Sequence, residues 1–431
     1  MKHLPIQSQQ YIDNRKRFVE ALNTHSVAIL NANDIMPTSA DGTMRFKQQT
    51  DLYYLTGIDQ EETILLVAPD HPDKNLREVL FLRETNEEVA IWEGHKYTKD
   101  EAMQVSGIAS VQWVSQFPRI LNQVMAESEF VYLNANEHLR ANIEVETRDA
   151  RFVKWCQNRY PLHSYARLAP IMHKLRAIKS ESEIELLRKA VEITGLGFQR
   201  VLQFVKPGVG EYEIEAEIIH EFIRNKATGF SFEPIIASGF NACVLHYISN
   251  RGVCNDGELL LMDFGADYAN YAGDLTRAIP VNGRYTRRQK DVYNAVLRVQ
   301  RAAKSMLVPG NTLPEYHKEV GKIMESELLG LGLLDKTDVK NQNTDMPAYK
   351  KYFMHGTSHH LGLDVHDYGN MYRAFEPGMV FTVEPGIYIR EESLGIRIEN
   401  DVVIRENGVE DLMERIPVEA DEIEEIMNAS N

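Results

Sequence analysis

Short runs of apolar residues in the first third of the chain predict buried strands that alternate with helices. The runs are Val27–Leu30, Thr63–Ala68 and Val79–Leu82, each of strand length. Helical patterns extend over residues 9–22, 101–105 and 117–125. Strands and helices in this order favour a mixed α/β unit with crossover connections.

A change of pattern between residues 166 and 179 indicates a domain boundary. Pro170 interrupts the preceding pattern, and Ser180 with Glu183 forms a capping box at the start of an amphipathic helix. We expect an N-terminal domain over residues 1–173 and a C-terminal domain over residues 174–431. In the second domain, two Pro-Gly pairs at 207–208 and 309–310 indicate either two related halves or the ordinary use of Pro-Gly to end helices.

Composition argues against several classes of function. The formal net charge is −16, with 47 Lys and Arg against 63 Asp and Glu, so we expect no nucleic-acid partner. Cys156, Cys243 and Cys254 are too few and too scattered for a disulfide framework. The N-terminal segment has no apolar stretch typical of a secretory signal, and no apolar run approaches the ~20 residues that span a bilayer. We therefore expect a cytoplasmic protein with no membrane partner.

Acidic residues at the ends of apolar strands are the first candidate chemistry. Asp263 directly follows an apolar run, and Asp274 precedes another apolar segment eleven residues later. Glu384 and Glu399 follow two further apolar runs. A buried carboxylate is costly unless it is paired or bound to a metal. Taken alone, the two aspartates are also compatible with turn capping, and Glu399 with an ion pair to Arg397.

A histidine-rich segment lies between the two pairs of carboxylates. His355, His359, His360 and His366 fall within twelve positions. A single histidine is ordinarily structural, but four beside strand-end carboxylates indicate a site. Four carboxylates with one imidazole suit manganese, cobalt, iron or zinc, and bridging carboxylates hold two such ions ~3.5–4 Å apart. Magnesium, which retains its waters, fits less well.

The order of these residues resembles the metal set of the pita-bread metallopeptidases, a group that includes methionine aminopeptidase, aminopeptidase P and prolidase. The surrounding segments are most similar to bacterial aminopeptidase P: residues 51–57, 245–247, 271–277, 353–356, 361–367, 383–386 and 396–399. The resemblance covers nearly the whole chain. It implies an N-terminal mixed α/β domain followed by a pita-bread catalytic domain, with two repeated α-β halves around an antiparallel sheet.

The resemblance also implies a set of metal ligands. Two divalent ions per chain, with Mn²⁺ expected first and Co²⁺, Zn²⁺ or Fe²⁺ as alternatives, would be held by Asp263, Asp274, His359, Glu384 and Glu399. Glu384 would also accept a proton from the attacking hydroxide that bridges the two ions.

Other residues receive catalytic and substrate-binding roles from the same resemblance. His246 and His366 would hold the scissile carbonyl and the leaving side, and His355 would contribute to substrate binding. Arg397 would orient an inner carboxylate. His360 is a departure, because relatives often carry an aromatic or other bulky residue after the ligand histidine.

The implied reaction is hydrolysis of an N-terminal Xaa-Pro bond, whose tertiary amide lacks the N–H that ordinary peptidases use. Peptides with proline at the second position would be the partners, and the protein would form a homodimer or homotetramer. Prolidase, which shares all five ligands but cleaves only dipeptides, is the nearest alternative, and Arg373 or Arg397 would be candidates for its carboxylate clamp. An inactive pita-bread binding module and a metal-free creatinase are the others, and the intact ligand set argues against both.

Overall fold

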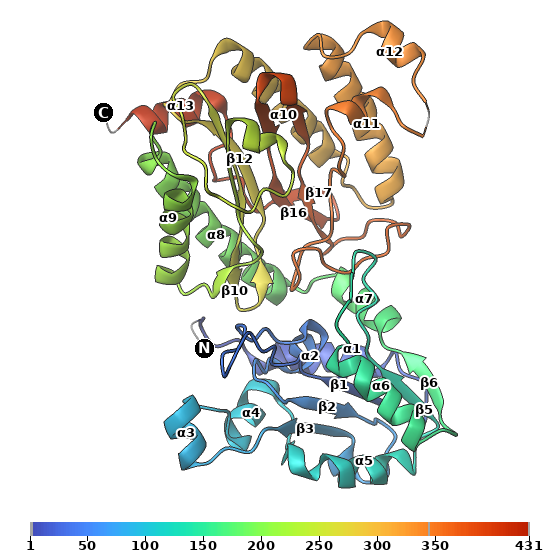
Figure 1. Cartoon of the computed structure of the whole chain (residues 1–431). Helices are drawn as coiled ribbons and strands as arrows, with labels where there is room; N and C mark the ends of the chain where they lie inside the picture. Colours follow the sequence, from blue (N-terminus) through green and yellow to red (C-terminus); the bar gives the residue numbers. More distant parts are fainter. Residues whose placement is uncertain (1–2, 344, 430–431) are drawn as a thin grey trace. The chain divides into compact units, whose positions relative to one another are not determined.

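The computed structural model describes residues 3–343 and 345–429, and the chain divides into two compact units (Figure 1). One unit comprises Leu4–Leu175, and the other begins at Arg176 and also takes in His3. The division into separately folding domains at residues 173 and 174 stays a prediction. Within the described part of the chain, no helix has both the length and the apolar character needed to cross a membrane.

The first unit is built on a six-stranded mixed sheet with the order β4-β3-β2-β1-β5-β6. The central strand β1 is antiparallel to β2 and parallel to β5. The three apolar runs expected as strands form β1, β2 and β3. The strands are β1 (Ser26–Asn31), β2 (Ile64–Val67), β3 (Glu78–Leu82), β4 (Ser110–Trp113), β5 (Phe130–Leu133) and β6 (Ser164–Arg167).

Most helices of this unit bury an apolar face against the sheet or a neighbouring helix, whereas α3 buries none of its residues. Phe117 of α5, for example, packs edge-on against Phe81 of β3 with ring centroids 5.1 Å apart. The three predicted helices are confirmed as α1, α4 and α5. The helices are α1 (Ser8–Val19), α2 (Thr50–Thr56), α3 (Glu87–Glu93), α4 (Lys99–Ser106), α5 (Phe117–Met125) and α6 (Arg148–Arg159).

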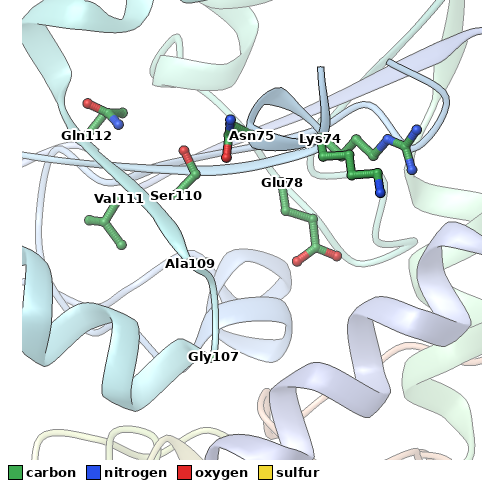
Figure 2. A pocket seen from close by; sticks show the side chains of 9 residues that line it. Lys74, Asn75, Glu78, Gly107, Ala109, Ser110, Val111 and Gln112 are labelled. Atoms are coloured by element: carbon green, nitrogen blue, oxygen red, sulfur yellow. The ribbon is translucent and has the colours of Figure 1, made fainter. Parts of the chain in front are cut away.

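A cavity of about 550 Å³ lies in the first unit beside β4. Figure 2 shows Lys74, Asn75, Glu78, Ser110 and Gln112 among the side chains around it. None of the candidate site residues lines this cavity. All the candidate site residues, from His246 to Glu399, belong to the second unit.

The interruption of the preceding pattern at Pro170 agrees with the structure, because β6 ends at Arg167 and a new helix begins at Ala169. Helix α7 (Ala169–Ala177) contains this proline in its first turn, where the missing N–H has no helical partner to lose. The capping box is confirmed, since the Ser180 side chain accepts from the Glu183 N–H at the start of α8 (Glu181–Phe204).

Two pairs of helices flank the strands of the second unit. Helix α8 packs against α9 (Glu211–Arg224), and α10 (Arg287–Ser305) packs against α11 (Leu313–Gly330) (Figure 1). A Pro-Gly pair precedes the second helix of each pair, and Gly208 and Gly310 both have φ of 93°, a conformation that favours glycine. This repeated geometry agrees with two related halves. The remaining helices are α12 (Lys336–Lys340) and α13 (Ala420–Asn428).

The strands of the second unit form small antiparallel sheets. The orders are β12-β9-β8, β13-β16-β17, β11-β10-β7 and the pair β14-β15. The two strands beside Asp263 and Asp274, β9 and β12, pair antiparallel, with Thr276 opposite Asp263. The strands are β7 (Gly229–Phe230), β8 (Ile235–Ser238), β9 (Leu259–Phe264), β10 (Ala266–Tyr268), β11 (Tyr271–Ala272), β12 (Leu275–Pro280), β13 (Val380–Val383), β14 (Gly386–Ile389), β15 (Leu394–Arg397), β16 (Asn400–Arg405) and β17 (Gly408–Asp411).

Candidate metal centre

Three of the predicted ligands converge from distant parts of the second unit. One ligand atom from each of Asp274, His359 and Glu399 lies within 4.8 Å of the others. Asp274 immediately precedes β12, and Glu399 lies between β15 and β16. The Thr276 hydroxyl donates to Glu399 Oε2 at 2.6 Å, which ties β12 to this connection. The ends of the strands thus bring oxygen and nitrogen donors to one place.

The imidazole of His359 is oriented by its own backbone neighbourhood. Its Nδ1 lies 2.9 Å from the carbonyl oxygen of His360, so Nδ1 donates its hydrogen there. Nε2 then faces Asp274 Oδ2 at 3.5 Å and Glu384 Oε1 at 3.7 Å. This tautomer leaves the Nε2 lone pair available to a metal.

The neighbouring His360 faces a different environment. Its ring lies 4.2 Å from that of Phe381, centroid to centroid. Gly369 leaves room for it, because a Cβ there would lie 1.8 Å from His360 Nε2. Burial lowers the pKa of His360 to about 3, so the ring is neutral. The geometry therefore favours His359 over His360 as the ligand.

Asp263 pairs directly with a buried arginine. Arg397 Nη2 lies 2.5 Å from Asp263 Oδ2. The same guanidinium donates to the hydroxyls of Thr276 at 3.1 Å and Tyr388 at 2.8 Å. The hydrogen-bonded ion pair of Arg397 is thus with Asp263, while Glu399 accepts from Thr276, which argues against the simple Glu399–Arg397 pair considered from sequence.

The carboxylates crowd one another in a buried site. Burial is the main cause that holds the pKa of Asp274 well above its ordinary value, and the negative charge of Asp263 is the next. Burial likewise holds the pKa of Glu399 well above its ordinary value, and the negative charges of Asp274 and Glu384 add to this effect. Burial raises the pKa of Glu384 to about 7, against the opposing effects of His359 and Arg397. The cluster carries more negative charge than Arg397 can balance, which favours binding of cations.

Two further histidines, His355 and His366, lie beside the acidic cluster, and His246 lies near His355. His355 Nδ1 lies 2.8 Å from the Gly356 carbonyl oxygen, and its Nε2 lies 2.8 Å from the Tyr388 hydroxyl. Burial is the main cause that lowers the pKa of His355 to about 3, and the positive charge of Arg397 lowers it further. The ring of His366 lies 4.4 Å from that of His359. His246 lies in an exposed turn, close enough to contribute to the lowered pKa of His355.

Sequence reasoning missed three residues that hold this arrangement together. Tyr388 links His355 to Arg397. Its position follows from the β14-β15 register, in which Gly386 faces Arg397 and Tyr388 lies two residues further on the same side. Thr276 faces Asp263 across β12 and β9. Asp401 accepts the Asp274 N–H at 3.0 Å, a contact for which the local sequence carries no signal.

Comparison with known families decides the classification. The sequence model of metallopeptidase family M24 matches residues 185–406, and that of the aminopeptidase P N-terminal domain matches residues 11–132. The chain belongs to metallopeptidase family M24. The predicted fold, an N-terminal α/β domain followed by a pita-bread domain, is confirmed by these matches.

Named relatives of this M24 chain extend over its full length. It is 36% identical to the Xaa-Pro aminopeptidase of Escherichia coli over 99% of both chains. It is 29% identical to Xaa-Pro aminopeptidase 3 of Homo sapiens, covering 95% of this chain and 82% of that one. Zinc-substituted E. coli aminopeptidase P in complex with product superposes with a TM-score of 0.88 at 35% identity, covering 99% and 100% of the chains. Proline aminopeptidase P II from Yersinia pestis gives 0.87 at 32% identity over the same shares.

Membership of this metallopeptidase family implies divalent metal ions, and the donor set fits them. Asp274, His359 and Glu399 offer two oxygens and one nitrogen at mutual distances suited to a shared ion. Oδ1 of Asp263 is buried and accepts no hydrogen bond from the described residues. A buried acceptor of this kind costs free energy unless a cation or donor reaches it.

Proposed function

We propose that this protein is a metal-dependent Xaa-Pro aminopeptidase, which removes the residue in front of an N-terminal Xaa-Pro bond. The observation that carries the proposal is the convergence of Asp274, His359 and Glu399 in a chain that is similar over its full length to the E. coli Xaa-Pro aminopeptidase. Glu384 lies 3.7 Å from His359. Asp263 pairs with Arg397, whose Nε donates to Thr276, the residue that donates to Glu399.

Five residues would hold two divalent ions in this proposal: Asp263, Asp274, His359, Glu384 and Glu399. Carboxylates with one imidazole suit Mn²⁺ first, with Co²⁺, Zn²⁺ and Fe²⁺ as alternatives. When bound, the ions supply an acidified water and polarise the scissile carbonyl.

The protein's own groups then move the proton and hold the substrate. Glu384 Oε1 lies 3.7 Å from His359 Nε2, beside the other proposed ligands, where its carboxylate can exchange a proton with the attacking water. It takes a proton from the attacking water and returns it to the proline nitrogen as the C–N bond breaks. His246 and His366 contact the scissile carbonyl and the leaving side, and His355 adds a substrate contact. Arg397 keeps Asp263 in place.

Whether Arg373 and Arg397 are already paired with carboxylates bears on the choice between this proposal and prolidase. A dipeptidase needs a cation for the proline carboxylate and rejects longer chains, which would leave that cation unpaired. Arg373 already pairs with Glu376 at 2.5 Å, and Arg397 with Asp263. Both candidate clamps therefore have carboxylate partners within the protein, which supports a site that accepts longer peptides.

The test compares kcat/KM for Ala-Pro-Ala, Ala-Pro and Ala-Ala-Ala with metal-reconstituted enzyme. We expect efficient release of alanine from Ala-Pro-Ala and little from Ala-Ala-Ala. A hundredfold or greater preference for Ala-Pro, about 2.7 kcal/mol, would make the enzyme a prolidase. Absence of cleavage with two ions bound would favour the inactive binding module.

We also propose a cytoplasmic homodimer or homotetramer. The three cysteines are buried and form no disulfide, which is typical of proteins in a reducing compartment. The first unit lacks all the candidate ligands, which supports a role in assembly or access instead of chemistry. Light scattering at micromolar concentration is expected to give a multiple of the 49.3 kDa chain mass, and a monomer would contradict the proposal.

A further inference from the structure

The loop that precedes and carries His246 is tied to one buried carboxylate. Glu211, the first residue of α9, is completely buried. Its Oε1 accepts the backbone N–H of Ser238 at 2.8 Å and the side-chain amide of Asn241 at 3.0 Å. Both donors lie on the N-terminal side of His246, at the end of β8 and in the 3₁₀ turn Gly239–Cys243.

The other carboxylate oxygen holds the far side of the same loop. Oε2 of Glu211 accepts the Tyr247 hydroxyl at 2.7 Å and the Gly252 N–H at 2.6 Å. The four donors therefore enclose His246 from both directions along the chain. His246 itself lies in an exposed turn between them.

The approach of this carboxylate to the loop is close enough to require glycine. A Cβ on Gly252 would lie 2.8 Å from Glu211 Oε1. One helical turn further along α9, Glu215 Oε2 accepts from the side chain of buried Asn250 at 2.8 Å. Helix α9 thus holds residues 238–252 at two points.

The charge of Glu211 is offset by hydrogen bonds instead of a counter-charge. No cation forms an ion pair with it in the part of the chain that the structure describes, and a buried carboxylate without one is costly. Four charge-assisted hydrogen bonds and the N-terminal position on α9 compensate. Because all four donors belong to one loop, the stabilised feature is the conformation of that loop.

We propose that Glu211 is a positioning residue for His246, which fixes the loop so that the imidazole is held at the metal centre. The inference rests on the proposed function, because the contact between His246 and substrate belongs to it. Glu211 does not contact the reacting atoms and acts through the loop alone.

The first test is Glu211→Gln in the full-length, metal-loaded enzyme. The substitution keeps the side-chain size but directs an amide NH₂ at groups that are themselves donors. We expect kcat to fall ten- to a hundredfold with metal content unchanged. The matched control is Glu217→Gln on the same helix, where the carboxylate pairs with Arg200 on α8, and wild-type kcat is expected there. Unchanged kcat in Glu211→Gln would overturn the inference.

A double-mutant cycle separates positioning from a general loss of structure. If Glu211 acts through His246, Glu211→Gln causes no further loss of kcat in a His246→Ala background. Losses that multiply would overturn the inference. Tyr247→Phe removes only one of the four donors, so it provides a milder variant if Glu211→Gln folds poorly, with a several-fold loss and the same lack of additivity expected.

Hydrogen exchange of residues 238–252 tests the inference without reference to activity, because the N–H groups of Ser238 and Gly252 donate directly to Glu211. Exchange is expected to accelerate in Glu211→Gln and to stay at the wild-type rate in Glu217→Gln. Unaltered protection in Glu211→Gln would overturn the positioning role whatever the peptide assays give. Accelerated exchange in an enzyme that cleaves no Xaa-Pro peptide would support the loop anchor and refute only the proposed function.

Discussion

Arg397 Nη2 lies 2.5 Å from Asp263 Oδ2, and the Arg397 side chain is almost completely buried while that of Asp263 is 13% exposed. The guanidinium also donates to Thr276 and Tyr388, so three of its nitrogens have fixed partners. It is therefore a buried cation held against one carboxylate of an acidic cluster, with its plane set by two hydroxyls.

Replacing this arginine by methionine is expected to damage the site strongly. Arg397→Met removes the positive charge and leaves Asp263 buried without its partner, and breaking such a pair typically costs about 3–5 kcal/mol. We expect a lower melting temperature and a fall of about 10²–10³ in kcat/KM for Ala-Pro-Ala. Arg405→Met is the control, because Arg405 pairs with Glu181 and Glu410 at the surface. Turnover close to wild type in Arg397→Met would show that Asp263 needs no orienting partner.

Two histidines outside the ligand set, His246 and His366, distinguish substrate contacts from metal binding. His246→Ala and His366→Ala are each expected to retain two ions per chain but to lose roughly 10²–10⁴ in turnover. His220, exposed on α9, gives the control His220→Ala with wild-type turnover. Metal analysis beside kinetics decides the question, and loss of metal from His366→Ala would make His366 a ligand.

Local patterns along the sequence were sufficient for much of the fold. Apolar runs give β1 to β3, and the Ser180 capping box marks the start of α8, because both signals involve residues a few positions apart. Pro170 marks the change from β6 to α7, because proline disfavours the middle of a helix yet suits its first turn. The carboxylates at strand ends could be found from the same local patterns.

The supporting contacts could not be found in this way, since they join distant residues. Gly252 donates to Glu211 from 41 positions away. Arg277, completely buried, donates to the backbone oxygen of Glu399 across 122 positions. Only the packing of the strands brings such groups together. The hairpin register that places Tyr388 beside Arg397 is the one such relationship that strand alternation could have suggested.

The raised pKa values predict an unusual dependence of stability on pH. The pKa of Glu384 rises from 4.5 to about 7 on folding, so the unfolded chain releases this proton at lower pH than the folded one. The metal-free protein therefore loses stability from Glu384 as pH rises through this interval. Metal binding requires ionised carboxylates, so its stabilising effect grows over the same interval.

Melting temperatures at pH 5.5 and 7.5, with and without Mn²⁺, measure this effect. Relative to Glu384→Gln, the metal-free wild type is expected to lose stability between the two pH values, and the gain on adding Mn²⁺ is expected to be larger at pH 7.5. An identical pH response in wild type and Glu384→Gln would show that the carboxyl does not titrate in this range.

The most direct test of the account is metal content measured beside turnover in Asp274→Ala and Glu399→Ala. Both residues are buried, and their ligand atoms converge with that of His359. Each variant is expected to bind fewer than two ions per chain and to lose cleavage of Ala-Pro-Ala, while Glu406→Ala, at an exposed turn, keeps both. Two tightly bound ions and a near-normal rate in either variant would contradict the assignment of this cluster as the metal centre of a peptidase.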